Sequence, residues 1–375
     1  MNHPSIEKSP LFKRWRDPVS GVESLVLSQR AAPIQQSFYF TNPSMTHDGR
    51  FLWLYGSFPP GGDAYYGRQL AVIDFAEQTL RHFPETQFSD ASPFVDRDTG
   101  EAYWITGLEI WKRGPLPGDQ ASRVAVFPAE LANNRRPVRI ATHLTLSADK
   151  KAFAIDALIG ADCFVGDLPL DGKTPFRLWQ TFDRCYNHAQ FSPTDPNLIL
   201  MAQDGWFDPA TGKKGTTEDR MWLLERGKKV RPVCPQAPLS SDWRGHEWWD
   251  ADGIHVWYID YRKGTEKVNI LTGEQTNVWP GGHTHSHNDQ KSQYLVGDIS
   301  PIRDQFRVAF LNIKTGREIN IVSDLPPLNY PRSAYHVHPH PQFCLNDRYI
   351  CYTTNALGTV DVALVSVDEL VGRTS

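Results

Sequence analysis

The sequence predicts an all-β protein with the architecture of a seven-bladed β-propeller. Three observations support this prediction: one strand pattern recurs along the chain, its spacing is nearly regular, and no helical period of any length competes with it. The 12% of aromatic residues and the 27 Gly and 28 Pro residues are typical of many short strands joined by tight turns. A double β-sandwich is the alternative architecture.

The repeated unit begins with a polar turn that contains an aspartate and continues as an apolar strand. The seven strands are RFLWLYGS, EAYWITG, KAFAIDAL, NLILMAQ, IHVWYID, SQYLVGD and RYICYTT, preceded in turn by Asp48, Asp98, Asp149, Asp195, Asp252, Asp289 and Asp347. Successive aspartates are 37 to 58 residues apart. A four-stranded propeller blade has roughly 40 to 50 residues, so each unit is expected to form one blade.

A second strand follows in each unit, and one N-terminal segment remains outside the repeats. The second strands are QLAVIDF, SRVAVF, CFVGDL, RMWLLE, EKVNIL, RVAFLN and DVALVSV. Residues 21–27 (GVESLVL) precede the first unit. We expect this segment to complete the last blade and close the ring, so that residues 1–375 form a single domain.

Composition excludes several classes of protein. With 40% hydrophobic and 22% charged residues and a net charge of −4, the chain reads as globular, and its charge favours neither nucleic acid nor an anionic membrane as partner. The first residues lack the apolar run of a signal peptide, and no stretch has the roughly 18 apolar residues of a membrane span, so a cytoplasmic protein is expected. The five cysteines show no CxxC spacing and are expected to be reduced and structural.

Histidines recur at comparable points of successive units. Of the 13 histidines, His143, His188 and His246 each lie six or seven residues before the aspartate of their unit, and further clusters surround His285 and His338. These positions fall on the innermost strands, which line the central channel of a propeller, so the imidazoles should converge at one channel mouth. The alternative is a polar position that serves only hydrogen bonding between blades.

The segment His338-Pro339-His340 is a candidate metal-binding pair. On a strand, alternate residues share a face, so both imidazoles would point the same way. A third ligand is available from His283, His285 or His287 in the preceding unit, and a site made of histidines alone accepts Mn, Fe, Ni or Zn. The alternative is a histidine-rich surface loop.

Two arginines add a second kind of functional group to the candidate site. Arg220 immediately precedes the strand MWLLE, and Arg244 lies two residues before His246. A guanidinium binds a carboxylate through two parallel hydrogen bonds, although Arg244 taken alone would usually be an ion-pair residue. Histidine, arginine and metal together suit the abstraction of a weakly acidic proton next to a carboxylate.

These motifs resemble those of the oligogalacturonate lyases, cytoplasmic seven-bladed propeller enzymes of pectin breakdown. The resemblance is carried by HAQFSP at 188–193, DRMWL at 219–223, GHEW at 245–248, VGD at 296–298, HPHP at 338–341 and, near the start, DPVSGV at 17–22. Residues 60–180 match no motif of the family. Tyr335 stands where the family has a glutamine ligand.

The resemblance implies site residues, a cofactor and a reaction. It implies His246 as general base, Arg220 as the arginine that engages the substrate carboxylate, and His285, His338 and His340 as ligands of a divalent metal, manganese in the family. His188, Arg244 and Tyr335 are expected to contribute to substrate binding. The implied reaction is metal-assisted β-elimination of short uronic-acid oligosaccharides, which leaves a 4,5-unsaturated uronate.

Other functions fit parts of the sequence. A lyase for another uronate linkage, such as glucuronate, and a propeller that serves only as an interaction platform are the alternatives, because a fold does not imply a function. A hydrolase with a carboxylate pair, Glu247 and Asp250, is a third. Four aromatic residues of the unmatched part are either sugar-stacking platforms or core residues: Tyr65, Tyr66, Trp104 and Trp111.

Overall fold

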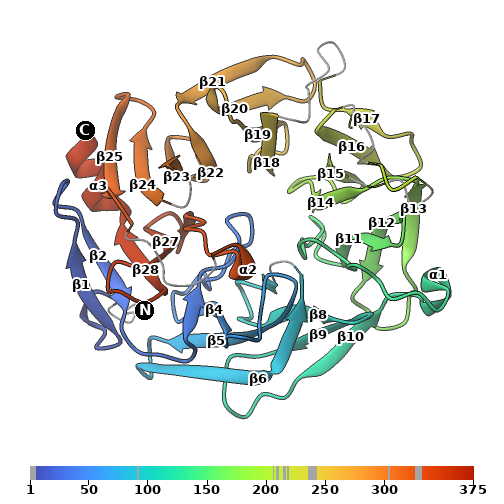
Figure 1. Ribbon diagram of the computed structural model, residues 1–375, viewed down its shortest axis with the longest axis horizontal. Helices are drawn as coiled ribbons and strands as arrows, with labels where there is room; N and C mark the ends of the chain where they lie inside the picture. Colours follow the sequence, from blue (N-terminus) through green and yellow to red (C-terminus); the bar gives the residue numbers. More distant parts are fainter. Residues whose placement is uncertain are drawn as a thin grey trace.

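The computed structural model describes residues 6–90, 93–205, 207, 211–213, 217, 219–234, 243–302, 305–325 and 332–375. Within these residues the strands form seven antiparallel sheets that follow one another around a central axis, as Figure 1 shows. The predicted seven-bladed β-propeller is therefore confirmed.

Each sheet runs from an innermost strand near the axis to an outer strand. The first two blades are β3 (Ile34–Gln36), β4 (Phe51–Ser57), β5 (Tyr66–Asp74) and β6 (Thr79–Ser89), then β7 (Phe94–Val95), β8 (Ala102–Thr106), β9 (Glu109–Arg113) and β10 (Ser122–Val126). The third is β11 (Ala152–Ile159), β12 (Asp162–Pro169) and β13 (Arg177–Phe182). The fourth is β14 (Tyr186–Phe191), β15 (Leu198–Gln203), β16 (Met221–Glu225) and β17 (Arg231–Pro232). The fifth and sixth are β18 (Arg244–Trp249), β19 (His255–Asp260), β20 (Gly264–Asn269) and β21 (Gln275–Pro280), then β22 (His283–Asn288), β23 (Tyr294–Ile302), β24 (Gln305–Asn312) and β25 (Arg317–Val322).

The last blade combines strands from both ends of the chain. It contains β26 (Gln342–Cys344), β27 (Tyr349–Thr354) and β28 (Asp361–Ser366), extended by β2 (Glu23–Leu27) and β1 (Phe12–Arg16). Leu25 and Val26 of β2 pair with Leu364 and Ala363 of β28. The N-terminal segment therefore closes the ring by antiparallel pairing, with β1 added as an outermost fifth strand.

Short helices occupy the periphery and the inner rim. They are the 3₁₀ helix η1 (Ile6–Lys8), α1 (Ala129–Ala132), α2 (Arg332–Tyr335) and α3 (Val367–Thr374). Figure 1 shows α3 outside the ring beside β25, and α2 near the ring's centre. No helix among the described residues is long and apolar enough to cross a membrane.

The recurring aspartates form the turns that start the apolar strands. The carboxylate of Asp48 accepts hydrogen bonds from the Thr46 hydroxyl and the N–H of Arg50, and similar turns recur in later blades. In the second blade the turn is built two residues earlier than expected, because Asp96 accepts from the N–H groups of Asp98 and Thr99. Local carboxylate-to-backbone bonds of this kind favour turns over continued strand.

The apolar core lies between neighbouring blades. Leu27 of β2, Leu52 and Leu54 of β4 and Leu364 of β28 belong to one buried cluster, which joins the last blade to the first. All five cysteines are free and buried, as expected of reduced structural residues. Burial of this apolar surface holds the blades in a closed ring, with the innermost strands facing the axis.

A substitution on β2 tests this closure. Leu27→Ala should lower the free energy of unfolding by about 2–5 kcal/mol, because Leu27 is fully buried between blades. The matched control is Leu271→Ala, since Leu271 is 74% exposed and should change stability by no more than about 0.5 kcal/mol. Denaturant unfolding measures both, and equally small losses would show that β2 is peripheral to the cooperative ring.

Candidate active site and metal centre

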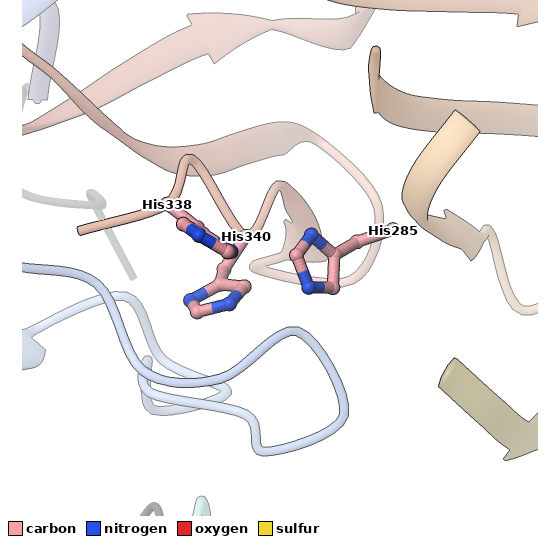
Figure 2. A group of neighbouring side chains, drawn as sticks. All are labelled: His285, His338 and His340. Carbon is pink, nitrogen blue, oxygen red and sulfur yellow. The ribbon is translucent and has the colours of Figure 1, made fainter. Parts of the chain in front are cut away.

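Three imidazoles from two adjacent blades meet near the channel axis. His285 lies on β22, and His338 and His340 lie in the segment that leads into β26. Their rings face one another (Figure 2), and one donor nitrogen from each lies within 4.8 Å of the other two. Imidazole nitrogens bind metal ions such as zinc at about 2 Å, so the three nitrogens can surround one ion.

The pair at 338 and 340 converges by a turn, which differs from the expected strand. Residues 337–340 form no strand, and β26 begins only at Gln342. His336 and His340 have positive φ values of 49° and 42°. Left-handed backbone is costly for a residue with a Cβ and is held only where the surroundings impose it. The prediction that strand alternation aligns the two rings was wrong.

Burial keeps the imidazoles of His285 and His340 neutral. Desolvation lowers the pKa of His285 and of His340 well below the usual histidine value, and the charge of His338 adds to the effect on His285. Among the described residues, Nε2 of His285 and both ring nitrogens of His340 are buried without a hydrogen-bond partner. Because a buried unsatisfied polar atom is costly, the residues fit a bound metal ion, which would take up the lone pair on Nε2 of His285 and the one lone pair that the neutral ring of His340 carries.

Asp298 orients the histidine triad, by which we mean His285, His338 and His340. Its carboxylate lies 2.8 Å from Nδ1 of His285 and accepts hydrogen bonds from the backbone N–H groups of His285 and His340. Burial raises the pKa of Asp298 to about 7. A carboxylate that accepts from Nδ1–H leaves the Nε2 lone pair of His285 aimed at the cluster, as in metal sites generally.

The other two histidines of β22 serve different contacts. His283 packs against the ring of Trp279, and Nδ1 of His287 accepts a hydrogen bond from the N–H of Phe343. The three candidates for the third ligand are thereby separated, since His285 is the one that joins His338 and His340.

His246 stands next to the triad. Its ring centroid lies 4.1 Å from that of His285. It occupies a bulge in β18, with φ of 51° and a register shift between Gly245 and Trp248. The bulge turns the imidazole toward the axis at the expense of backbone strain, a combination that is common at functional sites.

Tyr261 fixes the orientation of His246. Its hydroxyl oxygen lies 2.9 Å from Nδ1 of His246. If Nδ1–H donates to that oxygen, Nε2 carries the lone pair and can accept a proton. A Cβ at residue 245 would lie 2.6 Å from the same hydroxyl oxygen, so Gly245 leaves the space that Tyr261 needs.

His188 and His143 form a second imidazole pair on the same inner wall. Nε2 of His143 lies 2.6 Å from Nδ1 of His188. His188 has φ of 53° in a bulge of β14, the same device as at His246. The ring of Tyr39 stacks on His143 at 4.5 Å and also meets His340 at 4.9 Å. Tyr39 thereby joins the histidine pair to the triad.

Arg220 supplies a buried positive charge beside His246. Nε lies 3.2 Å from the carboxylate of Glu247, and Nη1 lies 3.4 Å from that of Asp204. Its charge lowers the pKa of both His188 and His246, after burial as the main cause. The two carboxylates hold the guanidinium in one position.

Two predicted substrate-binding residues have other surroundings. Arg244 pairs with Asp260 at 3.5 Å and lies over the ring of Tyr258. Tyr335 is buried in an apolar cluster with Ile34 and Val337. Neither is brought into the imidazole cluster by a contact among the described residues, so substrate binding by them stays a prediction.

Sequence reasoning missed Tyr39, Tyr261 and Asp298. Tyr39 lies nine residues before Asp48, outside the spacing of six or seven residues that the histidines keep, so the repeat pattern gave no signal for it. Asp298 and Tyr261 act through other residues, and their pairing with His285 and His246 depends on strand register.

Comparison with known proteins supports the family resemblance. No model of a known protein family matches the chain. The oligogalacturonate lyase of Dickeya dadantii (strain 3937) is 26% identical over 207 residues, which cover 49% of this chain and 50% of the relative. The oligogalacturonide lyase of Pectobacterium atrosepticum is 27% identical over 206 residues, with the same coverage. The chain thus spans about half the length of the curated relatives it matches.

Solved structures extend the likeness in fold to almost the whole chain. A structure described as oligogalacturonate lyase in complex with manganese superposes with a TM-score of 0.75 at 18% identity, covering 96% of this chain and 97% of that one. The oligogalacturonate lyase of Vibrio parahaemolyticus gives 0.73 at 18% identity, covering 95% and 96%. The resemblance found in the sequence is therefore confirmed.

The carboxylate behind the triad can be tested through metal affinity. Asp298→Asn should weaken binding of a divalent ion such as Mn²⁺ by about 10- to 100-fold, because the carboxylate that orients the ligand and raises its basicity is lost. Asp183→Asn is the control, since the side chain of Asp183 is 87% exposed. Calorimetric titration of the metal-free protein measures both, and unchanged affinity in Asp298→Asn would contradict the orienting role.

Proposed function

Starting from its likeness to the oligogalacturonate lyases, we propose that this chain is a lyase that cleaves short uronic-acid oligosaccharides by β-elimination, assisted by a divalent metal ion, with manganese as the first candidate. One observation carries the proposal. A base with a free nitrogen, a buried guanidinium and three imidazoles that can hold a metal ion lie in one cluster at the channel axis.

The reaction requires charge neutralisation at the substrate carboxylate. The proton at C5 of a uronate is weakly acidic, and it becomes removable when the negative charge that develops on the carboxylate is stabilised. Arg220 supplies a fixed positive charge near His246, held in place by Glu247 and Asp204. A divalent ion held by His285, His338 and His340 would act as a Lewis acid toward the same carboxylate.

His246 is the proposed base. Burial, with His285 and Arg220 nearby, lowers its pKa well below the usual value, so the imidazole is neutral and can take a proton. With Nδ1 turned to Tyr261, Nε2 takes the C5 proton. The electron pair of the C5–H bond forms the C4–C5 double bond while the 4-linked sugar departs with its oxygen, and this oxygen takes up one proton, which balances the proton lost from C5. No water enters the products.

The alternative functions find less support. A hydrolase would need two carboxyl groups facing the sugar, yet Glu247 is paired with Arg220, and Asp250 accepts hydrogen bonds from Trp257 and Ser292. A mere interaction platform offers no reason for buried imidazole lone pairs that face one another at the axis.

Product analysis tests the function directly. The protein is incubated with digalacturonate and, in parallel, with diglucuronate. The masses of the products are then measured by mass spectrometry. Elimination gives two fragments whose masses sum to that of the substrate, one of them unsaturated, whereas hydrolysis adds one water. A platform leaves both substrates intact. The comparison also decides which uronate is the substrate, and intact substrates in the metal-loaded protein would overturn the proposal.

Replacing the base should stop the reaction without removing the metal. His246→Ala should lower turnover by about 10²- to 10⁴-fold, because proton abstraction loses its acceptor. Metal content and melting temperature should stay close to those of the unaltered protein. His255→Ala is the matched control, since His255 pairs with Asp252 at the start of β19. A His246→Ala protein with full turnover would remove this residue from the mechanism.

Metal removal should separate catalysis from folding. Chelation should abolish turnover and lower the melting temperature only slightly, because the blades are held by buried apolar clusters that do not involve the triad. Added Mn²⁺ should restore turnover. The account would be contradicted by turnover that persists in protein shown to be metal-free by elemental analysis.

A further inference from the structure

Arg68 on β5 is a buried cation without a counter-ion. Arg68 is only 6% exposed. In the described part of the chain, it forms no ion pair with a carboxylate within 4 Å. Nη2 donates to the backbone carbonyl of Tyr335 at 3.0 Å, and the guanidinium lies 4.8 Å from the ring centroid of Tyr55. Nε is buried and has no hydrogen-bond partner among the described residues.

These neutral contacts compensate poorly for the burial of a full charge. A guanidinium taken out of water requires an anion or several well-formed hydrogen bonds. Asp90 lies close enough for the charge of Arg68 to act on its carboxyl group, but the two side chains form no ion pair within 4 Å. The site around Arg68 is therefore suited to an anion that comes from outside the chain.

Arg68 lies beside the imidazole cluster, on a different side of it from Arg220. Tyr335, whose carbonyl it binds, is the last residue of α2 and immediately precedes His336. The ring of His336 lies 4.4 Å from that of His338. Figure 1 shows β5 and β16, which follows Arg220, in blades that are well separated around the ring. A ligand long enough to span the cluster can thus meet both arginines.

The loop of residues 63–66, which precedes Arg68 in the chain, offers apolar surface. Tyr65 and Tyr66 are 76% and 46% exposed, whereas Trp104 is 2% exposed and belongs to the core. Asp63 accepts hydrogen bonds from the N–H groups of both tyrosines, and the N–H of Ala64 donates to Ala334 of α2. The backbone of this loop, which directly precedes the strand segment of Arg68, is therefore held against α2, and exposed aromatic rings are suited to stacking on a sugar.

We propose that Arg68, with Tyr65 and Tyr66 at its rim, forms a second carboxylate-binding subsite, which takes the carboxylate of the uronate next to the one that undergoes elimination. This inference rests on the proposed function. It explains why a cation is buried here without a partner, and it makes an oligomer with at least two free carboxylates the preferred substrate class.

The test compares two substrates and three variants. The substrates are digalacturonate and its methyl ester at the carboxylate of the sugar that keeps its C5 proton. The variants are Arg68→Met, Arg68→Lys and the control Arg50→Met, since Arg50 on the same blade pairs with Asp74. Steady-state kinetics, melting temperature and metal content are measured for each.

For digalacturonate, Arg68→Met should raise KM by about tenfold or more and leave kcat within a few-fold, because a charge-assisted contact to a non-reacting group is lost. The KM of Arg68→Lys should lie between those of Arg68→Met and the unaltered protein, and the KM of Arg50→Met should equal that of the unaltered protein. On the mono-ester, the unaltered protein and Arg68→Met should have the same KM. Melting temperature should be unchanged or higher in Arg68→Met, since an uncompensated buried charge is removed.

A melting temperature that falls in Arg68→Met, with equal losses on both substrates, would assign Arg68 a structural role and overturn the inference. Unchanged KM in Arg68→Met would overturn it as well. Binding is measured separately by calorimetry of digalacturonate with His246→Ala and with His246→Ala/Arg68→Met, where equal affinities contradict the subsite. This arm does not need turnover, so failure of the proposed lyase activity remains distinguishable from failure of the subsite.

Discussion

Neutral imidazoles that face one another away from water are the constraint on which the site depends. Nε2 of His285 and both ring nitrogens of His340 have no hydrogen-bond partner among the described residues, and burial keeps these rings uncharged. A neutral ring carries one lone pair, so each of the two rings has one lone pair without a partner. Such lone pairs are costly in a protein interior unless a cation takes them up. Asp298 sets the tautomer of His285 and joins the backbones of two blades, so one carboxylate organises the triad.

The propeller supplies this arrangement because its innermost strands all reach the same axis. Regular strands alone would not orient the side chains, and β14 and β18 each carry a bulge with a left-handed histidine. The strain at His188 and His246 is tolerated because buried clusters between the blades fix the surrounding strands. A rigid outer structure thus holds a strained inner surface on which the proposed base, a cation and the proposed metal ligands lie together.

The fold and much of the site could be predicted from the sequence because both follow the repeat. Apolar strands at blade-like intervals gave the seven blades, and histidines at one position of successive units indicated the channel. Local geometry could not be predicted in the same way: the rings at 338 and 340 converge through left-handed turns, and the turn of the second blade uses Asp96. No motif marks the remaining residues. The roles of Tyr261 and Asp298 follow from contacts across strands, which depend on strand register. The role of Arg68 follows from burial without a charged partner.

The central claim is that His285, His338 and His340 hold one divalent ion next to His246. Crystals of the protein grown with Mn²⁺ and measured at a wavelength where manganese scatters anomalously test it most directly. The account predicts a single strong anomalous peak between the three imidazoles, about 2 Å from one nitrogen of each. An empty position between well-ordered imidazoles, or a manganese ion bound elsewhere by carboxylates, would contradict it.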